Sequence, residues 1–431
     1  MKLNIKTNEK TGENLYSGIL ESGLSVYIMP KKGYTSTYAI LATKYGSVDS
    51  DFIVPGEENI THVPDGIAHF LEHKMFEQED GSNVFESFTK TGAMCNAYTS
   101  FNLTGYLFKS SDNPYESLKI LLDYVQKPYF TPENVEKEQG IIGQEINMED
   151  DNPGWILLFN FLKGMYHKNP VRLEIAGSVE SISKIDADVL YKCYNTFYNL
   201  SNMALVLVGD IDPDKAMDVI EKGILKDEPF AEEIKRIYPD EPETILAKEK
   251  IQKMKVAMPM FMFGFKDNDI GYGGEKLLKK NIELDILNEM IFGKSSPLYE
   301  KLYNEGLINQ SFGAEFEPQI NYGFTAVEGE SKEPEKVYNL SIEYIENLKN
   351  KGLLEDDFER IKKVIWGRYI RSYNDIGDFS HKFISMKFMD IDYTEYFNVY
   401  KTISFDDVKK RFETHFNKKF SVLSVIEPIE S

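Results

Sequence analysis

The stretch GIAHFLEHKMFE, residues 66–77, combines the spacing of a buried helix face with a group of metal-binding side chains. Its large apolar residues recur three, four and eight positions along the chain, as on one side of an amphipathic helix: Ile67, Phe70, Leu71 and Met75. On that helix His69, Glu72 and His73 fall at i, i+3 and i+4 and project from one side. Two imidazoles and one carboxylate held close together are donors that suit a catalytic zinc ion.

The alternative interpretation is that these three side chains form only a polar stripe on a surface helix. The chain has six histidines among 431 residues, and we expect this pattern by chance in roughly one such chain in a hundred. A catalytic zinc also takes a third protein ligand and leaves its fourth position to water. The motif therefore predicts a further ligand elsewhere in the chain.

Composition indicates a globular protein of two or more domains. Hydrophobic residues make up 42% of the chain and charged residues 28%. The polar start, residues 1–18, has no apolar core of a secretory signal, and the longest apolar run, around 203–211, is too short to span a bilayer. Cys95 and Cys193 are too few for a disulfide framework. We therefore expect a cytoplasmic protein without a membrane partner, and the net charge of -21 argues against a nucleic-acid partner.

The order of the expected elements repeats in the two halves of the chain. Strand-like stretches at 23–30 and 36–48 precede the histidine-bearing helix, and a strand-like stretch at 255–267 precedes a helix at 281–293. A second helix and further strand-like segments follow in both halves. The metal-binding side chains are not repeated, since the aligned positions of the later helix hold Asp285, Asn288 and Glu289. An internal duplication with a single metal site is the simplest interpretation.

The segment 226–250 separates the two halves. It is acidic, contains prolines and has no sustained apolar periodicity, which is typical of a linker or a peripheral excursion. We therefore predict a metal-bearing N-terminal domain at residues 1–225 and a duplicated C-terminal domain without a metal site at 251–431. Each half fits the α+β fold class, with helices packed on one face of a mostly antiparallel sheet.

A helix downstream of the motif offers candidates for the third ligand. The stretch 131–155 begins with Thr131 as an expected N-cap and Pro132 at the first helical position. Glu138 and Glu145 are seven residues apart on it, two turns, and therefore share one face. Either could equally be an ordinary solvated glutamate, because the chain has 70 acidic residues.

The His-x-x-Glu-His motif, followed by this paired-glutamate helix, resembles the pitrilysin/insulinase family of zinc peptidases. The resemblance extends through GAMCNAYTSFNLTGYLF, residues 92–108, and YNLSNMALVLVGDID, residues 198–212, and covers nearly the whole chain. Length and duplication fit the half-length branch, which includes the mitochondrial processing peptidase and bacterial relatives.

The resemblance implies a role for each residue of the motif. His69, His73 and Glu145 would bind Zn²⁺, and Glu72 would be the general base of a metalloendopeptidase. Glu138 would be a catalytic-site carboxylate that holds a histidine ligand by its N–H.

The resemblance also implies how peptides bind. The strand that follows Gly92 would be an edge strand onto which an extended peptide adds as a further strand, inside an enclosed chamber. The residues expected to bind substrate are Ala93, Asn96, Ala97 and Thr99. The alternative is an ordinary core strand.

One part of the family pattern is missing. The second domain normally supplies an arginine and, seven residues later, a tyrosine, which help to hold substrate and oxyanion. Here Tyr303 and Asn309 stand near those positions, and no arginine occurs between Arg236 and Arg360. We therefore expect a heterodimer, in which a second family subunit supplies Arg and Tyr. A self-sufficient monomer or homodimer, or a non-catalytic structural subunit, remain the alternatives.

Overall fold

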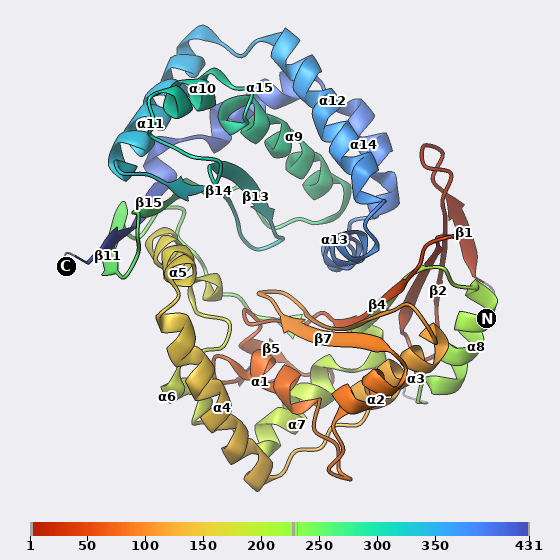
Figure 1. Ribbon diagram of the computed structural model, residues 1–431. Helices are drawn as coiled ribbons and strands as arrows, with labels where there is room; N and C mark the ends of the chain where they lie inside the picture. Colours follow the sequence, from red (N-terminus) through yellow and green to blue (C-terminus); the bar gives the residue numbers. More distant parts are fainter. Residues whose placement is uncertain (1–2, 226–228, 231, 430–431) are drawn as a thin grey trace. The chain divides into compact units, whose positions relative to one another are not determined.

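The structure is a computed structural model that describes residues 3–225, 229–230 and 232–429 (Figure 1). Its helices and strands form two compact units, each described by itself below. The first unit takes three segments of the chain: Met1–Ile146, Leu173–Tyr238 and Ser372–Phe388. The second unit takes the other three: Asn147–Arg172, Pro239–Arg371 and Met389–Ser431. Among the described residues, no helix combines the length and apolar composition that crossing a bilayer requires.

The first unit is built on a seven-stranded sheet in the order β1-β2-β3-β9-β4-β8-β7. Neighbouring strands are antiparallel except β3 and β9, which run parallel. The strand β7 stands at one edge. The bounds are β1 Asn4–Thr7, β2 Asn14–Ile19, β3 Ser25–Pro30, β4 Thr37–Thr43, β7 Ala93–Thr99, β8 Thr104–Ser110 and β9 Met203–Gly209.

Helices cover both faces of this sheet. Because successive strand residues point to opposite faces, Val26 and Ile28 of β3 enter the core cluster formed with most helices of the unit. Tyr27 between them instead packs on Phe383 of α13, with ring centroids 4.9 Å apart. The helices of the unit are α1 Ile67–Lys74, α2 Val84–Lys90, α3 Pro114–Val125, α4 Pro132–Asp150 up to Ile146, α6 Val179–Ile182, α7 Ala187–Phe197, α8 Pro213–Gly223 and α13 Ile376–Phe388.

The second unit has a five-stranded sheet in the order β11-β15-β12-β14-β13, in which only β11 and β15 run parallel. Gly264 of β12 lies against Phe161 of α5, and a Cβ there would come within 2.8 Å of that ring. Phe263, on the opposite face, packs on Phe292 of α9. The strands are β11 Glu249–Met254, β12 Met260–Lys266, β13 Gly313–Pro318, β14 Gly323–Glu330 and β15 Ser421–Pro428. The helices are α5 Pro153–Met165, α9 Gly274–Phe292, α10 Pro297–Asn304, α11 Pro334–Lys351, α12 Glu355–Ser372, α14 Tyr396–Thr402 and α15 Phe405–His415.

The α+β class and the mostly antiparallel sheets that we predicted from the sequence are confirmed. Helices lie on both faces of each sheet, not on one face as predicted, because α13 and α5 add a second layer. The compact units group α5 with the second sheet and α13 with the first. The domain boundaries at residues 225 and 251 remain a proposal.

Parts of the described segment between the halves are hydrogen-bonded into each unit. In the first unit β10, Lys235–Arg236, pairs with β5, Asp51–Ile53, in a three-stranded sheet that β6, Thr61–His62, completes. In the second unit Glu241 accepts hydrogen bonds from the backbone of residues 167–169 and pairs with Lys266 at 2.7 Å. Residues 226–228 and 231 of the predicted linker lie outside the described residues.

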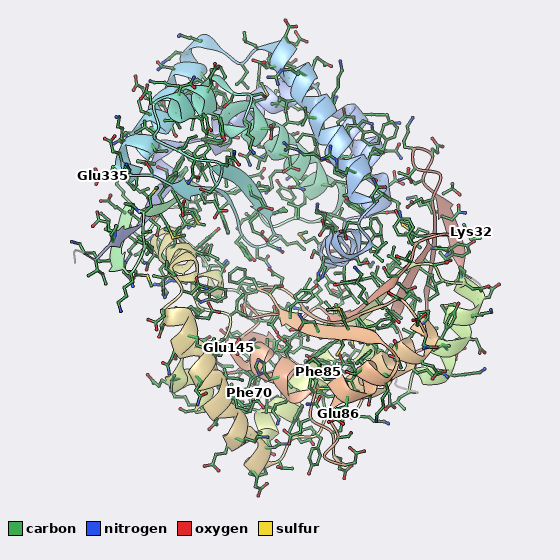
Figure 2. The ribbon with its side chains drawn as sticks, viewed as in Figure 1. Lys32, Phe70, Phe85, Glu86, Glu145 and Glu335 are labelled. Carbon is green, nitrogen blue, oxygen red and sulfur yellow. The ribbon has the colours of Figure 1, made fainter. Side chains whose placement is uncertain are left out.

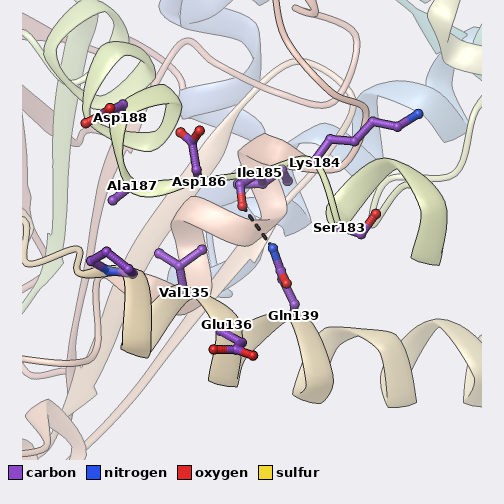
Figure 3. Close-up of a pocket in the computed structure, with 10 residues that line it drawn as sticks. Val135, Glu136, Gln139, Ser183, Lys184, Ile185, Asp186, Ala187 and Asp188 are labelled. Atoms are coloured by element: carbon purple, nitrogen blue, oxygen red, sulfur yellow. Dashed lines mark hydrogen bonds between the residues drawn. The ribbon is translucent and has the colours of Figure 1, made fainter.

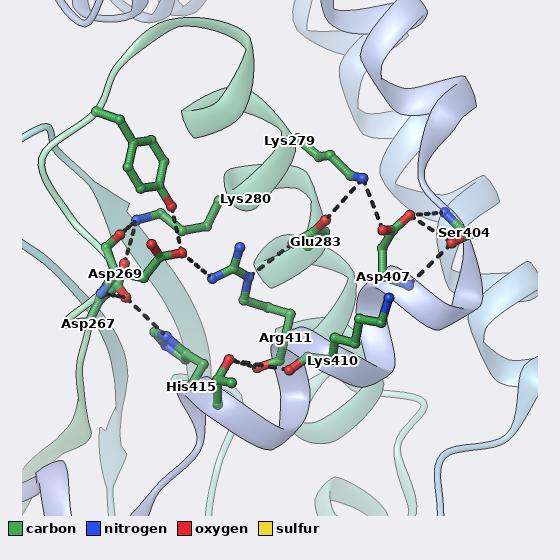
Figure 4. Close-up of polar contacts among 12 residues, drawn as sticks. Asp267, Asp269, Lys279, Lys280, Glu283, Ser404, Asp407, Lys410, Arg411 and His415 are labelled. Atoms are coloured by element: carbon green, nitrogen blue, oxygen red, sulfur yellow. Dashed lines mark hydrogen bonds and ion pairs between the residues drawn. The ribbon is translucent and has the colours of Figure 1, made fainter.

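A partly buried group of charges joins α9 and α15 to the end of β12 in the second unit (Figure 4). The ammonium of Lys280 lies 2.6 Å from the carboxylate of Asp267. The guanidinium of Arg411 bridges Glu283, at 3.0 Å, and Asp269, at 2.8 Å. The Lys280–Asp267 pair is buried, so that removing either of these two charges alone would be destabilising.

His415 lies at the end of this group. We expect its titration to make the stability of the chain depend on pH. Burial lowers the pKa of His415 to about 4 from 6.5, with Arg411 and Lys280 adding to the decrease against the carboxylate of Asp267. The unfolded chain therefore binds more protons between pH 6.5 and 4, and stability falls as the pH falls through that range. We expect a loss of about 2 kcal/mol between pH 8 and pH 5 from this group.

Urea unfolding at pH 8 and pH 5 measures this loss. His415→Gln should unfold with a smaller difference between the two pH values than the parent. An unchanged difference would show that His415 titrates normally in the folded chain.

Candidate metal centre

The helix α1 presents the histidines on the side opposite its core face. Phe70 and Leu71 are fully buried in the core cluster of the first unit. The helix begins at Gly66, whose φ of 91° is left-handed. A Cβ at Gly66 would lie 2.3 Å from the carbonyl oxygen of Ala176, so glycine allows the close approach of this loop.

The helix α4 begins where the sequence predicts. The Thr131 side chain accepts from the Asn134 backbone N–H at 3.2 Å, and Asn134 accepts from the Thr131 backbone in return. Away from the histidines, Gln139 donates to the Ile185 carbonyl at 2.9 Å beside a surface cavity of about 400 Å³ (Figure 3). This cavity holds none of the predicted site residues, and the hydrogen bond ties α4 to the segment before α7.

Three of the predicted residues bring their donor atoms together. Nε2 of His69 lies 3.5 Å from one oxygen of Glu145, and Nε2 of His73 lies 3.4 Å from the other. All three donor atoms lie within 4.8 Å of one another, and no second such group occurs among the described residues. Figure 2 shows Glu145 on α4 near α1, which carries Phe70.

This arrangement fits a zinc ion. Two ligands, each about 2.0–2.1 Å from one tetrahedral zinc, are about 3.3–3.4 Å apart, close to the two separations observed. Nδ1 of His73 lies 3.1 Å from Glu138, and a carboxylate can only accept. Nδ1 therefore carries the hydrogen, and in the neutral ring the lone pair of Nε2 faces Glu145, as metal binding requires.

The contacts between the histidines and the glutamates also shift the pKa values of these groups. Burial lowers the pKa of His73, but the hydrogen bond with Glu138 and the charges of Glu72, Glu145 and Glu138 outweigh burial and raise the pKa above its usual value. The hydrogen bond from His69 is the largest cause that lowers the pKa of Glu145. Acidic groups surround both imidazoles, which is the environment that a divalent cation neutralises.

Glu72 precedes His73 on α1 and is not one of the three grouped donors. Its side chain is nearly buried, and Thr99 donates a hydrogen bond of 2.7 Å to one of its oxygens. We expected Thr99 to contact substrate, and the structure places its hydroxyl on this carboxylate instead of leaving it free.

The other predicted substrate residues lie on β7, the edge strand of the sheet. Ala93 is buried, Ala97 is half-buried and Asn96 is exposed. In the second unit, Tyr303 is 48% exposed and stacks on Tyr299. Asn309 donates a hydrogen bond to Glu330 at 2.8 Å. Neither of the two positions expected to hold the family's arginine and tyrosine carries an arginine.

Lys74 is a feature of the site that the sequence reasoning missed. It is the last residue of α1 and is fully buried, with its ammonium among Glu77, Glu138 and the carbonyl of Asn134. The signal was present, because Lys74 follows Ile67 by seven residues and therefore lies on the apolar face of the helix.

The chain belongs to the insulinase family of peptidases, family M16, and is a half-length member of it. The family model for insulinase matches residues 59–179, and the model for the M16 inactive domain matches residues 184–365. The resemblance drawn from the motif is thereby confirmed.

Individual relatives cover nearly all of the chain. The uncharacterized zinc protease YmfH of Bacillus subtilis is 43% identical over 93% of this chain and 94% of its own length. A crystal structure of an M16-like peptidase from Alicyclobacillus acidocaldarius is 34% identical, with a TM-score of 0.93 over 98% of this chain and 100% of that chain. A protease from Helicobacter pylori, 20% identical with a TM-score of 0.80 over 96% of this chain and 99% of that chain, shares the fold.

We predict that Glu145→Gln weakens zinc binding by at least about a hundredfold. Loss of an outer hydrogen-bond partner of a ligand already costs about 10–100-fold, and this change removes the charge of a ligand itself. Zinc titration with a competing chelator measures the effect. Glu136→Gln, an exposed change on the same helix, is the matched control. Full occupancy in Glu145→Gln would exclude Glu145 as a ligand and make Glu138 the next candidate.

Proposed function

We propose that this chain is a zinc-dependent endopeptidase that hydrolyses short or unfolded peptides. The observation that supports this best is the meeting of His69, His73 and Glu145 beside the nearly buried carboxylate of Glu72. Catalytic zinc sites typically have three protein ligands and a water, whereas structural zinc sites normally have four protein ligands. When bound, zinc would polarise the peptide carbonyl as a Lewis acid and make water a stronger acid.

Glu72 carries out the proton transfers in this proposal. Its carboxylate takes a proton from the water that attacks the peptide carbonyl and then passes that proton to the leaving amine. The hydrogen bond from Thr99 occupies one oxygen of Glu72, which orients the carboxylate and leaves the other oxygen to exchange the proton. Glu138 orients His73 in the same way.

The free edge of β7 would hold the substrate. An edge strand has unpaired backbone N–H and C=O groups on one side, and an extended peptide can pair with them as an added strand. Asn96 and Ala97 would lie against this peptide, together with Ala93. Backbone pairing accepts many sequences but requires an extended chain, which is why we propose short or unfolded peptides as substrates.

The proposed active form is a heterodimer in which this chain is the metal-bearing subunit. The positions where the family has an arginine and a tyrosine hold Tyr303 and Asn309 here. An oxyanion donor stabilises the transition state by about 3–4 kcal/mol. A second subunit carrying Arg and Tyr would therefore raise the rate of hydrolysis strongly. The two subunits would enclose a chamber in the cytoplasm. A self-sufficient monomer or homodimer is the alternative assembly.

A chelation experiment tests the proposed activity. The chain is incubated with an unstructured peptide, alone and with a family member that has the arginine and tyrosine, and fragments are identified by mass spectrometry. We expect internal cleavage that a chelator stops and added zinc restores. A chelated sample as active as the loaded one would contradict zinc catalysis. Zinc binding without cleavage in either mixture would favour a non-catalytic subunit.

A further inference from the structure

The buried ammonium of Lys74 has two hydrogen-bond acceptors and one further ion-pair partner in the first unit. Its Nζ lies 2.5 Å from Glu77, 3.3 Å from the carbonyl of Asn134 and 3.7 Å from Glu138. Glu77 and the Asn134 carbonyl accept hydrogen bonds from the ammonium, and Glu138 pairs with it as an opposite charge. A fully buried lysine is rare unless its charge is paired, so the geometry of this group is tightly determined.

The same Glu138 carboxylate connects Lys74 to the metal centre. One oxygen faces Nδ1 of His73 at 3.1 Å, and the other faces Lys74. Lys74 and His73 are adjacent on α1, and both contact Glu138 of α4. The orientation of the His73 ring therefore depends on a carboxylate that is itself held from its other side.

The second histidine has no equivalent support. Nδ1 of His69 is buried and has no hydrogen-bond partner in the described part of the chain. Hydrogen bonds from outside the ligand group normally fix both tautomer and ring orientation. The chain from Lys74 through Glu138 to His73 thus supplies orientation that His69 lacks.

The charges around the centre give Lys74 a second effect. Four carboxylates, those of Glu72, Glu77, Glu138 and Glu145, gather around α1. A fully buried cation between Glu77 and Glu138 offsets their mutual repulsion, which helps to keep Glu138 close to His73.

We propose that Lys74 is a positioning residue of the metal centre, which fixes the Glu138 carboxylate and through it the imidazole of His73. The proposal rests on the proposed zinc site. If Lys74 only joined α1 to α4, replacing it would lower stability equally with and without metal.

Lys74→Met tests the proposal, because methionine is also unbranched and apolar along its length but has no charge. We expect zinc affinity, measured by competition with a chelator at pH 7.5, to fall about tenfold, the lower end of the range for outer partners of a ligand. The rise in melting temperature on adding zinc should shrink accordingly. In the Glu138→Gln background, Lys74→Met should cause no further loss of affinity.

Lys31→Met is the matched control. Lys31 is also a buried lysine of the first unit, paired with Glu13 and with the carbonyl of Tyr373, and none of these residues belongs to the metal centre. This change should lower the melting temperature without altering zinc affinity.

Three results distinguish the possible failures. Absence of zinc binding by the parent chain would overturn the proposed function itself. Two results would overturn the role of Lys74. One is a zinc affinity of Lys74→Met within twofold of the parent. The other is that Lys74→Met lowers zinc affinity as much in the Glu138→Gln background as in the parent. If Lys74→Met does not fold, Glu138→Gln alone decides, because unchanged affinity in that variant leaves Lys74 no route to the metal.

Discussion

Glu72→Gln should lower peptide hydrolysis by about a thousandfold while zinc stays bound. General-base catalysis contributes about 10²–10⁴-fold, and glutamine cannot accept the proton of the attacking water. Because Glu72 is not one of the three grouped donors, the change removes the base without removing a ligand. The measurement is kcat on an unstructured peptide, with zinc content determined on the same sample.

A neighbouring glutamate provides the control for Glu72→Gln. Glu86 is exposed on α2 (Figure 2), and Glu86→Gln should retain full activity. Equal activity of Glu72→Gln and the parent, both loaded with zinc, would exclude Glu72 as the general base.

The second large effect concerns assembly. The purified chain alone should be nearly inactive on unstructured peptides, because its second unit has Tyr303 and Asn309 where the family has arginine and tyrosine. Adding a family member that has both residues but a degenerate metal motif should raise turnover by about a hundredfold or more, the scale of an oxyanion donor. The assay is peptide cleavage as the second chain is titrated in.

A variant of the companion chain tests the origin of this gain. Replacing its arginine should abolish the increase while zinc stays on the present chain. Rapid turnover by the single chain would contradict the heterodimer and favour the self-sufficient assembly.

Local sequence predicted which side chains share a face on each of the two helices, and the family resemblance linked the helices as one site. The spacing of Ile67, Phe70 and Leu71 placed the histidines on one side of α1, and the cap at Thr131 placed Glu138 and Glu145 on one face of α4. These features depend on helix periodicity and capping. The structure brings the two helices together as expected, and the ligand roles remain predictions for the experiments above.

Other features depend on contacts between distant parts of the chain. Periodicity indicates which face of α5 or α13 is apolar, but not which sheet that face covers. The hydrogen bond from Thr99 to Glu72 depends on the placement of β7 relative to α1. Lys74 stands on an apolar face, but its acceptors on α4 become visible only when the helices pack.

The most direct test of the zinc site is a crystal structure of the zinc-loaded chain with anomalous diffraction recorded at the zinc edge. We expect one strong anomalous peak per chain, bounded by Nε2 of His69, Nε2 of His73 and a carboxylate oxygen of Glu145. Absence of a peak there from a fully loaded crystal, or a peak bounded by other residues, would contradict the proposed zinc site.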